Sequence, residues 1–262
     1  MSILRLRYSR GAFFIINPLF NLFLARYIYG MKPFVDAHCH YDAAAFAKYS
    51  GAGYFICNAA RESDWAPLLS GAARNRHIIP ALGLHPWYVT AAADGWAGRL
   101  RDILEKYPDV MVGEIGLDAG RENMDAQYDA FVTQYQMAAS LGRGVHIHCV
   151  RAWDRMTHVL KTCTPPPLVV MHRYSGSAQI MADLISSDAN IYFSYNSASG
   201  GRLHNLIDIT PSDRILVETD AAKPDSDTIF DVISQMAATR GVSIDEMAQI
   251  LYDNGQKVIK NG

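Results

Sequence analysis

The sequence predicts an α/β fold, a single-domain (β/α)8 barrel of the TIM type. Eight short apolar or β-branched runs recur along the chain, and helical patterns separate several of them. Most runs are too short for helices and lack the strict polar alternation of an exposed antiparallel strand, so we expect buried parallel strands. The expected strands are Phe34–His38, Tyr54–Asn58, Ile78–Leu82, Val110–Glu114, Val145–His148, Leu168–His172, Asn190–Ser194 and Arg214–Glu218.

The clearest helical patterns lie in the second half of the chain. The longest places apolar residues at helical spacing and ends at Gly142, as a helix C-cap would. The last helix opens with Ser243 and Glu246 at the spacing of a capping box. We therefore expect helices over Asp125–Leu141, Ala178–Ser187 and Thr228–Thr239, and from Ser243 onward.

A closed barrel is the simplest arrangement of these alternating strands and helices. Connections between parallel strands keep one hand, and helices cover the faces of a parallel sheet. An open doubly wound sheet is the competing architecture, but no G-x-G-x-x-G pattern follows a strand. A length of 262 residues suits a barrel of one domain.

The first thirty residues are set apart from this barrel. Arg5, Arg7 and Arg10 precede an apolar run over 12–25 that Pro18 interrupts, in the outline of a signal peptide or weak anchor. The run is too short and too interrupted for a membrane span, so we expect no membrane association and favour a translation start at Met31. The chain is thus divided into an apolar N-terminal extension, 1–30, and the barrel, 31–262.

The composition limits the partners and the compartment. A formal net charge of −2 argues against a broad nucleic-acid-binding surface, although a phosphate-bearing substrate still suits a small, locally positive pocket. The four cysteines form no C-x-x-C pair, which indicates reduced, buried thiols in a cytoplasmic protein. The apolar N-terminal segment leaves export as an alternative.

Residues of the types that bind metals end five of the expected strands. Active sites of (β/α)8 barrels form at the carboxyl ends of the strands, and imidazole and carboxylate suit zinc, manganese and related cations. His38 and His40 have the spacing of a strand, so both rings can point into the barrel mouth. One such pair is weak evidence, but an ordered set at strand ends is specific. The candidate ligands are His38, His40, Glu114, His148, His172 and Asp220.

The order and surroundings of these residues resemble the TatD-type metal-dependent deoxyribonuclease family of the amidohydrolase-like superfamily. The similarity runs from about Met31 to the end of the chain. The matching segments are Asp36–Asp42, Gly83–Pro86, Gly113–Asp118, Ile147–Cys149, Met171–Gly176 and Glu218–Ala221. The chain departs from the family pattern in the loops after His148, His172 and Asp220, which would contact the substrate.

The resemblance implies a role for each candidate ligand at a centre of two divalent ions (zinc, magnesium or manganese). It implies that His38 and His40 bind one ion with Asp220. Glu114 would bridge to the second ion, which His148 and His172 would complete. Such a pair of cations acidifies a bound water and stabilises charge in the transition state. Asp220 is the candidate base for that water, with Glu114 as the other catalytic carboxylate.

Three further residues are candidates for contacts with substrate. His85 is expected to touch a substrate phosphate or the leaving group, and Arg173 and Lys223 are expected to neutralise phosphate. For each, a structural role is the alternative: a loop histidine before a proline, a rim salt bridge and a solvent-exposed lysine. We expect Asp42 to orient one of the first two histidines, and His146 to be a hydrogen-bonded interior residue.

These observations predict a metal-dependent hydrolase, most simply a phosphodiesterase of the TatD type acting on a phosphate-containing substrate such as DNA. An amide, lactone or carboxylic-ester hydrolase using the same activated water is the first alternative. A catalytically idle metal-binding scaffold is the second. Arg173, Lys223 and Arg151 converging on the metal site would favour phosphate, whereas an apolar rim would favour acyl substrates.

Overall fold

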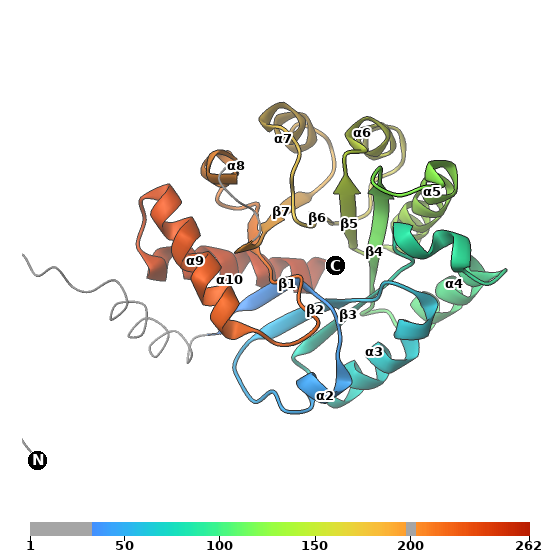
Figure 1. Cartoon of the computed structure of the whole chain (residues 1–262), viewed down its shortest axis with the longest axis horizontal. Helices are drawn as coiled ribbons and strands as arrows, with labels where there is room; N and C mark the ends of the chain where they lie inside the picture. The colour runs from blue at the N-terminus through green and yellow to red at the C-terminus, as the bar shows by residue number, and fades with distance from the viewer. Residues whose placement is uncertain (1–32, 198–202) are drawn as a thin grey trace, which may run out of the picture.

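The structure, a computed structural model, describes residues 33–197 and 203–262 and contains an eight-stranded parallel barrel (Figure 1). The strands follow one another around the sheet in chain order, from β1 to β8, and each is parallel to the next. The strands are β1 (Val35–Cys39), β2 (Tyr54–Asn58), β3 (Ile78–Leu82), β4 (Met111–Asp118), β5 (Val145–Val150), β6 (Val169–Met171), β7 (Ile191–Tyr195) and β8 (Ile215–Val217).

Backbone hydrogen bonds between the segment after β8 and β1 close the ring. The Asp220 amide donates to the His38 carbonyl at 2.9 Å, and the His40 amide donates to the Ala221 carbonyl at 2.8 Å. The prediction of a single-domain (β/α)8 barrel is therefore confirmed. A doubly wound sheet is excluded because the strand order never reverses.

Helices surround the strands on the outside of the barrel (Figure 1). All four expected helices are present, with ends that differ from the predicted ones by at most two residues. The final helix begins after Ser243, whose hydroxyl accepts the Glu246 amide as predicted. The helices are α2 (Ala43–Phe46), α3 (Glu62–Arg74), η1 (Pro86–Ala91, a 3-10 helix), α4 (Trp96–Lys106), α5 (Met124–Leu141), α6 (Trp153–Thr162), α7 (Ala178–Ile185), α8 (Leu203–Ile209), α9 (Ser226–Arg240) and α10 (Ile244–Asn261).

The apolar side chains form two layers, because alternate strand residues face opposite sides of the sheet. Phe55 and Cys57 of β2 belong to the larger cluster, which packs the strands against the helices. Ile56, between them, belongs to a smaller cluster inside the barrel that includes Val258 of α10. Helix α10 runs to the middle of the barrel, where the Gly144 amide donates to the Gly262 carbonyl at 2.8 Å (Figure 1). This helix covers the amino ends of the strands and leaves their carboxyl ends open.

The predicted extension over 1–30 lies outside the described residues. Within the described ranges, no helix combines the length and the apolar character that a membrane span requires. All four cysteines are free. Three of them are buried as predicted, and Cys163 is half-buried.

Candidate metal centre

All six candidate ligands lie close together at the carboxyl ends of five strands. Together with His85, their ligand atoms fall into three overlapping groups, in each of which the atoms lie within 4.8 Å of one another. The groups are His38–His40–Glu114, His38–His172–Asp220 and His85–Glu114–His148. A cavity of about 430 Å³ opens above them. Its lining is His40, Tyr41, Asn58, Ala60, Arg61, Asp64, His85, Trp87, Tyr88, Glu114, His148, His172, Arg173 and Asp220.

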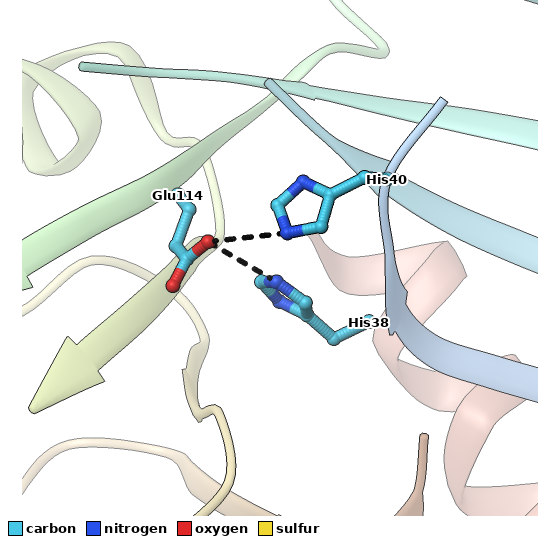
Figure 2. Close-up of side chains that lie close together, drawn as sticks. All are labelled: His38, His40 and Glu114. Carbon is cyan, nitrogen blue, oxygen red and sulfur yellow. Dashed lines mark ion pairs between the residues drawn. The ribbon is translucent and has the colours of Figure 1, made fainter. Parts of the chain in front are cut away.

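A bulge in β1 places the rings of His38 and His40 on the same side, with His38 buried and His40, directly after the strand, lining the cavity. Asp36 pairs with Phe55 and Cys39 with Cys57, so three steps along β1 match two along β2. The extra residue changes the alternation. Asp36 leaves the face that it would otherwise share with His38 and His40, while both rings turn toward Glu114 (Figure 2).

Glu114 of β4 is the centre of the cluster. Its carboxylate is buried and lies 3.4 Å from His38 Nε2, 3.7 Å from His40 Nε2 and 2.9 Å from His148 Nδ1. A carboxylate oxygen is also 3.6 Å from His172 Nε2. Burial alone would raise the pKa of Glu114, but the surrounding histidines hold the pKa well below its usual value. A carboxylate in this position can share its two oxygens between two cations.

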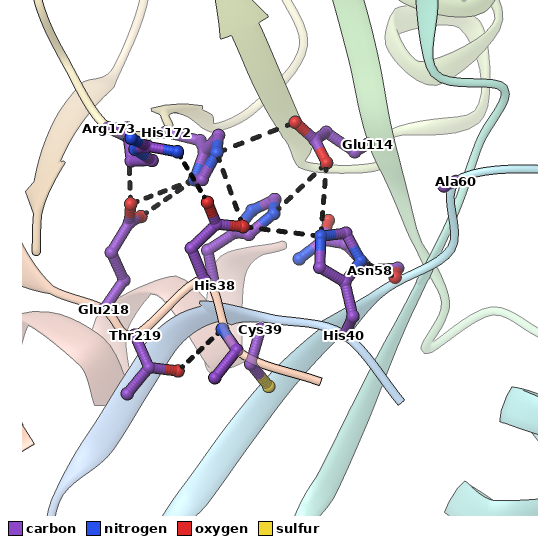
Figure 3. Close-up of polar contacts among 12 residues, drawn as sticks. His38, Cys39, His40, Asn58, Ala60, Glu114, His172, Arg173, Glu218 and Thr219 are labelled. Carbon is purple, nitrogen blue, oxygen red and sulfur yellow. Dashed lines mark hydrogen bonds and ion pairs between the residues drawn. The ribbon is translucent and has the colours of Figure 1, made fainter. Parts of the chain in front are cut away.

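The partners of His40 and His172 fix which ring nitrogen faces the cluster. His40 Nδ1 is 3.0 Å from the Asn58 carbonyl oxygen, which only accepts, so Nδ1 carries the proton in the neutral ring. His172 Nδ1 lies 3.0 Å from the buried carboxyl group of Glu218 (Figure 3). In both rings the other nitrogen, Nε2, faces Glu114, at 3.7 Å in His40 and 3.6 Å in His172. Metal-binding histidines are commonly oriented in this way.

Two other histidines among the candidate ligands have buried ring nitrogens without a hydrogen-bond partner in the described chain. His38 is fully buried, and neither of its ring nitrogens has a partner; the same holds for Nε2 of His148. Buried polar atoms nearly always have a partner, so these orphan nitrogens call for a further ligand. Imidazole and carboxylate donors suit zinc or manganese. The residues present therefore fit a divalent-metal centre.

Asp220 completes the cluster from the loop after β8. Its carboxylate lies 3.4 Å from His40 Nε2, 4.0 Å from His172 Nε2 and 2.9 Å from Nη1 of Arg173. Burial would raise the pKa of Asp220, but the hydrogen bond with His40 and the nearby histidines lower it. Burial lowers the pKa of His40, yet its contacts with Asp220 and Glu114 raise that pKa to about 9. Cations that bind here compete with this shared proton.

The loops that begin at the cluster adopt unfavourable backbone conformations. Arg151, Arg173 and Asp220 follow β5, β6 and β8, and all three have positive φ, at 52°, 43° and 57°. Such values are uncommon for residues other than glycine and concentrate at functional sites. These residues orient the ends of three strands around one cavity.

Two buried acids beneath the cluster were not predicted from the sequence. The hydroxyl of Thr219 donates to Asp36 Oδ2 at 2.5 Å, and the Thr219 amide donates to Asp36 Oδ1 at 3.0 Å. Glu218 accepts from the Ser194 hydroxyl and from the Arg173 amide, the latter at 3.1 Å. Burial raises the pKa of each carboxyl group to about 8. The sequence signal that could have identified them is their spacing. Asp36 lies two residues before His38, and Glu218 lies two residues before Asp220.

The predicted substrate residues separate into two near the cavity and one away from it. His85 is buried and its Nε2 is 3.4 Å from Glu114, while its Nδ1 accepts the Trp87 amide at 3.2 Å. Nε2 therefore carries the proton of the neutral ring, and His85 presents a donor to the cavity. Arg173 also lines the cavity, but Lys223 is exposed and does not line it. Arg151 is exposed and does not line it either.

Two subsidiary expectations were wrong. Asp42 does not orient a cluster histidine; it caps α2, and its Oδ1 accepts the Ala45 amide at 2.7 Å. His146 is buried one layer deeper, as expected, but neither ring nitrogen has a hydrogen-bond partner within the described ranges. Spacing alone could not show that a helix begins directly after Asp42 and takes its carboxylate as a cap.

The fold and the cluster together define a class of protein, the metal-dependent hydrolases that are built on a (β/α)8 barrel. The chain belongs to the TatD-related DNase family, whose model matches residues 35–260. This assignment confirms the predicted family and the prediction of a metal-dependent hydrolase.

Curated relatives and solved structures agree with this assignment. The uncharacterized metal-dependent hydrolase YjjV of Escherichia coli is 27% identical over 256 residues, covering 84% of this chain and 95% of the relative. The 3'-5' ssDNA/RNA exonuclease TatD of Pantoea ananatis is 28% identical and covers 76% of this chain and 84% of the relative. The crystal structure of E. coli YjjV superposes with a TM-score of 0.77 at 26% identity, over 86% of this chain and 97% of that one.

Proposed function

We propose that the chain is a phosphodiesterase that acts on single-stranded nucleic acid with two divalent cations, zinc, manganese or magnesium. The observation that carries the proposal is the meeting of six side chains of metal-ligand type, with the buried Glu114 carboxylate at their centre. In our assignment His38, His40 and Asp220 would hold one ion, His148 and His172 would hold the other, and Glu114 would serve both. The bound pair would acidify a water molecule and neutralise negative charge that develops on the phosphate.

The chain's own residues would supply the remaining steps. Asp220 is the proposed base, because its carboxylate lines the cavity 3.4 Å from His40 Nε2, where it can orient the attacking water and accept its proton. His85 would donate its Nε2 proton toward the leaving oxygen. Arg173, which already contacts Asp220 at 2.9 Å, would pair with a phosphate oxygen.

Two observations support a phosphodiester over an acyl substrate. Several relatives carry the name 3'-5' ssDNA/RNA exonuclease TatD, among them the proteins of Pantoea ananatis and Erwinia amylovora. Two arginines, Arg61 and Arg173, line the cavity beside the cluster, although Lys223 and Arg151 do not. Aromatic side chains form much of the remaining wall, which suits stacked bases as well as apolar acyl groups.

The test is a hydrolysis screen of the full chain with added zinc, manganese or magnesium. The substrates are a short single-stranded oligonucleotide, bis(p-nitrophenyl) phosphate, and a panel of amides and lactones. We expect cleavage of both phosphodiesters, and in Asp220→Asn a loss on the order of a thousandfold in kcat/KM. Asparagine tolerates the positive φ of 57° at this position, so the backbone is preserved.

The matched control is Asp213→Asn, because Asp213 is an exposed acid whose carboxylate lies 3.8 Å from Nε of Arg214, on the surface. Full activity is expected of this control. Clear acyl hydrolysis with no phosphodiester cleavage would transfer the assignment to the amide or lactone class. Equal turnover by the wild type and Asp220→Asn would remove the proposed centre altogether.

A further inference from the structure

An exposed tryptophan stands at the edge of the metal cavity. Trp87 of η1 is 48% exposed, and it lines both the metal cavity and a second cavity of about 540 Å³. The other large apolar residues that are exposed in the described chain, Tyr107, Ile185 and Ile209, line neither cavity. Single exposed apolar residues are ordinary. The position between two adjoining cavities is what distinguishes Trp87.

The indole of Trp87 is held in place from several sides. Its Nε1–H donates to Asp118 Oδ2 at 2.6 Å, and the guanidinium of Arg121 lies 4.1 Å from the ring centroid. The His85 ring meets it edge to face at 5.1 Å. A side chain that is already ordered loses little entropy when a ligand packs against it. The indole is therefore a fixed aromatic surface beside the cluster.

The second cavity offers partners for a nucleotide. Within the described residues, no carboxylate lies within ion-pair distance of Arg121, whereas Arg61 pairs with Asp64 and Arg173 with Asp220. Asn123, the N-cap of α5, also lines the cavity, and no side chain caps the first turn, so its amides can face an anion. The lining is Pro86, Trp87, Tyr88, Val89, Thr90, Gly120, Arg121, Glu122 and Asn123.

Charge alone would give this cavity little affinity for nucleic acid. Glu122 is the acidic residue among its lining residues, and its charge offsets that of Arg121. Stacking on the indole is then the main attraction. Bases of every kind stack on aromatic side chains, because each base has a π-face. A subsite of this kind would be tolerant of sequence.

We propose that Trp87 and Arg121 form a nucleotide-binding subsite next to the metal centre. The indole stacks with the base of the nucleotide adjacent to the scissile phosphate, and Arg121 pairs with the flanking phosphate. The subsite makes the chain prefer single-stranded oligonucleotides over small phosphodiesters. This inference rests on the proposed phosphodiesterase function and deepens it.

The first experiment measures binding of a fluorescein-labelled oligothymidylate to the full chain by anisotropy, in EDTA, so that no cleavage occurs. We expect Trp87→Ala to raise the Kd by about tenfold, as for the loss of one stacked base. Trp87→Phe keeps an aromatic face but loses the bond to Asp118, and should retain most of the binding. Arg121→Gln should raise the Kd by a smaller factor.

The matched control is Tyr107→Ala. Tyr107 is also an exposed aromatic residue with a cation over its ring, Lys106 Nζ at 5.3 Å, but it lines neither cavity. The Kd of Tyr107→Ala for the oligothymidylate should equal that of the wild type. An unchanged Kd in Trp87→Ala overturns the subsite. An equally raised Kd in Trp87→Phe and Trp87→Ala overturns the stacking assignment, because the bond to Asp118 then accounts for the effect.

A second experiment separates the subsite from the proposed function. With metal added, Trp87→Ala should lower kcat/KM for the oligonucleotide about tenfold more than for bis(p-nitrophenyl) phosphate. Equal losses on both substrates overturn the subsite and leave the phosphodiesterase intact. Conversely, a wild type that cleaves neither substrate, but binds the oligonucleotide through Trp87, overturns the phosphodiesterase and leaves the subsite.

Discussion

The two ends of the barrel are built from the same strands and differ in every other respect. At the amino end, Val35, Ile56 and Met111 pack with Val258 of α10 in a buried apolar layer. At the carboxyl end, the buried positions hold His38, Glu114 and Glu218 instead. Arg151, Arg173 and Asp220, which have positive φ and lie in the loops after β5, β6 and β8, are also at this end.

This difference shows how the molecule divides stability from chemistry. Burying ionisable groups and adopting a left-handed backbone both cost free energy, so the carboxyl end destabilises the fold. Apolar burial stabilises the fold by roughly 25 cal/mol per Å². The buried apolar area lies at the amino end, which α10 seals, and between the strands and the outer helices. Changes at the carboxyl end should therefore alter metal binding and activity, and changes at the amino end should alter stability.

The largest effect is expected at the centre of the carboxyl end. Glu114→Gln removes the negative charge that the surrounding histidines share, while it preserves the shape of the side chain. We expect metal content to fall from two ions per chain and kcat/KM to fall on the order of a thousandfold. Metal analysis by mass spectrometry and a phosphodiesterase assay measure the two quantities.

Glu105→Gln is the control, because Glu105 lies on α4 and contacts Arg101 at 3.6 Å on the exposed surface. This variant should keep the full metal content and activity. If Glu114→Gln retained both ions and its activity, the carboxyl end would not be the site of chemistry, and the contrast between the two ends would lose its functional meaning.

A smaller effect is expected one layer below the ligands. Glu218 orients His172 through Nδ1 and also accepts the Arg173 amide. Glu218→Gln should weaken metal affinity by about 10–100-fold, as for other groups that orient a metal-binding histidine. Competition with a colorimetric chelator gives the affinity. Activity should return at saturating metal, and a variant that stays inactive when fully loaded would give Glu218 a direct part in the chemistry.

The sequence was informative where a physical rule connects residue type to position. Eight apolar runs that alternate with helical patterns predicted the barrel. The carboxyl ends of barrel strands meet at one rim, so metal-ligand residues at those ends predicted the cluster of His38, Glu114 and Asp220. The helix from Ser243 was predictable from its cap and its apolar spacing. Helix α3 was not, since Pro67 and Gly71 lie within it and normally interrupt helices.

What the sequence did not predict depends on three-dimensional detail. The bulge in β1 reverses the alternation between Asp36 and His38, and nothing in the spacing marks it. Lys223 follows Asp220 closely in the chain, yet the loop carries it away from the cavity. Trp87 and Asp118 are far apart in sequence and meet only through the barrel. Contacts of this kind require the path of each loop, which local patterns leave open.

The smallest effect is expected at the sealed end, and it concerns stability. Gly255 of α10 packs against β1 so closely that an added Cβ would lie 2.4 Å from Val35 Cβ. Alanine favours helices over glycine by about 1 kcal/mol, but forcing the helix off the strand costs about 1–3 kcal/mol. Gly255→Ala should therefore lower the free energy of unfolding by up to about 2 kcal/mol, measured by urea denaturation.

Gly98 of α4 provides the opposite case, because no heavy atom lies within 4 Å of its added Cβ. Gly98→Ala should raise the free energy of unfolding by about 0.5–1 kcal/mol. Both variants should bind metal as the wild type does, since neither glycine lies near the cluster. A change in metal affinity in Gly255→Ala would mean that the packing of α10 on β1 sets the positions of His38 and His40, so that the two ends of the barrel are coupled through that strand.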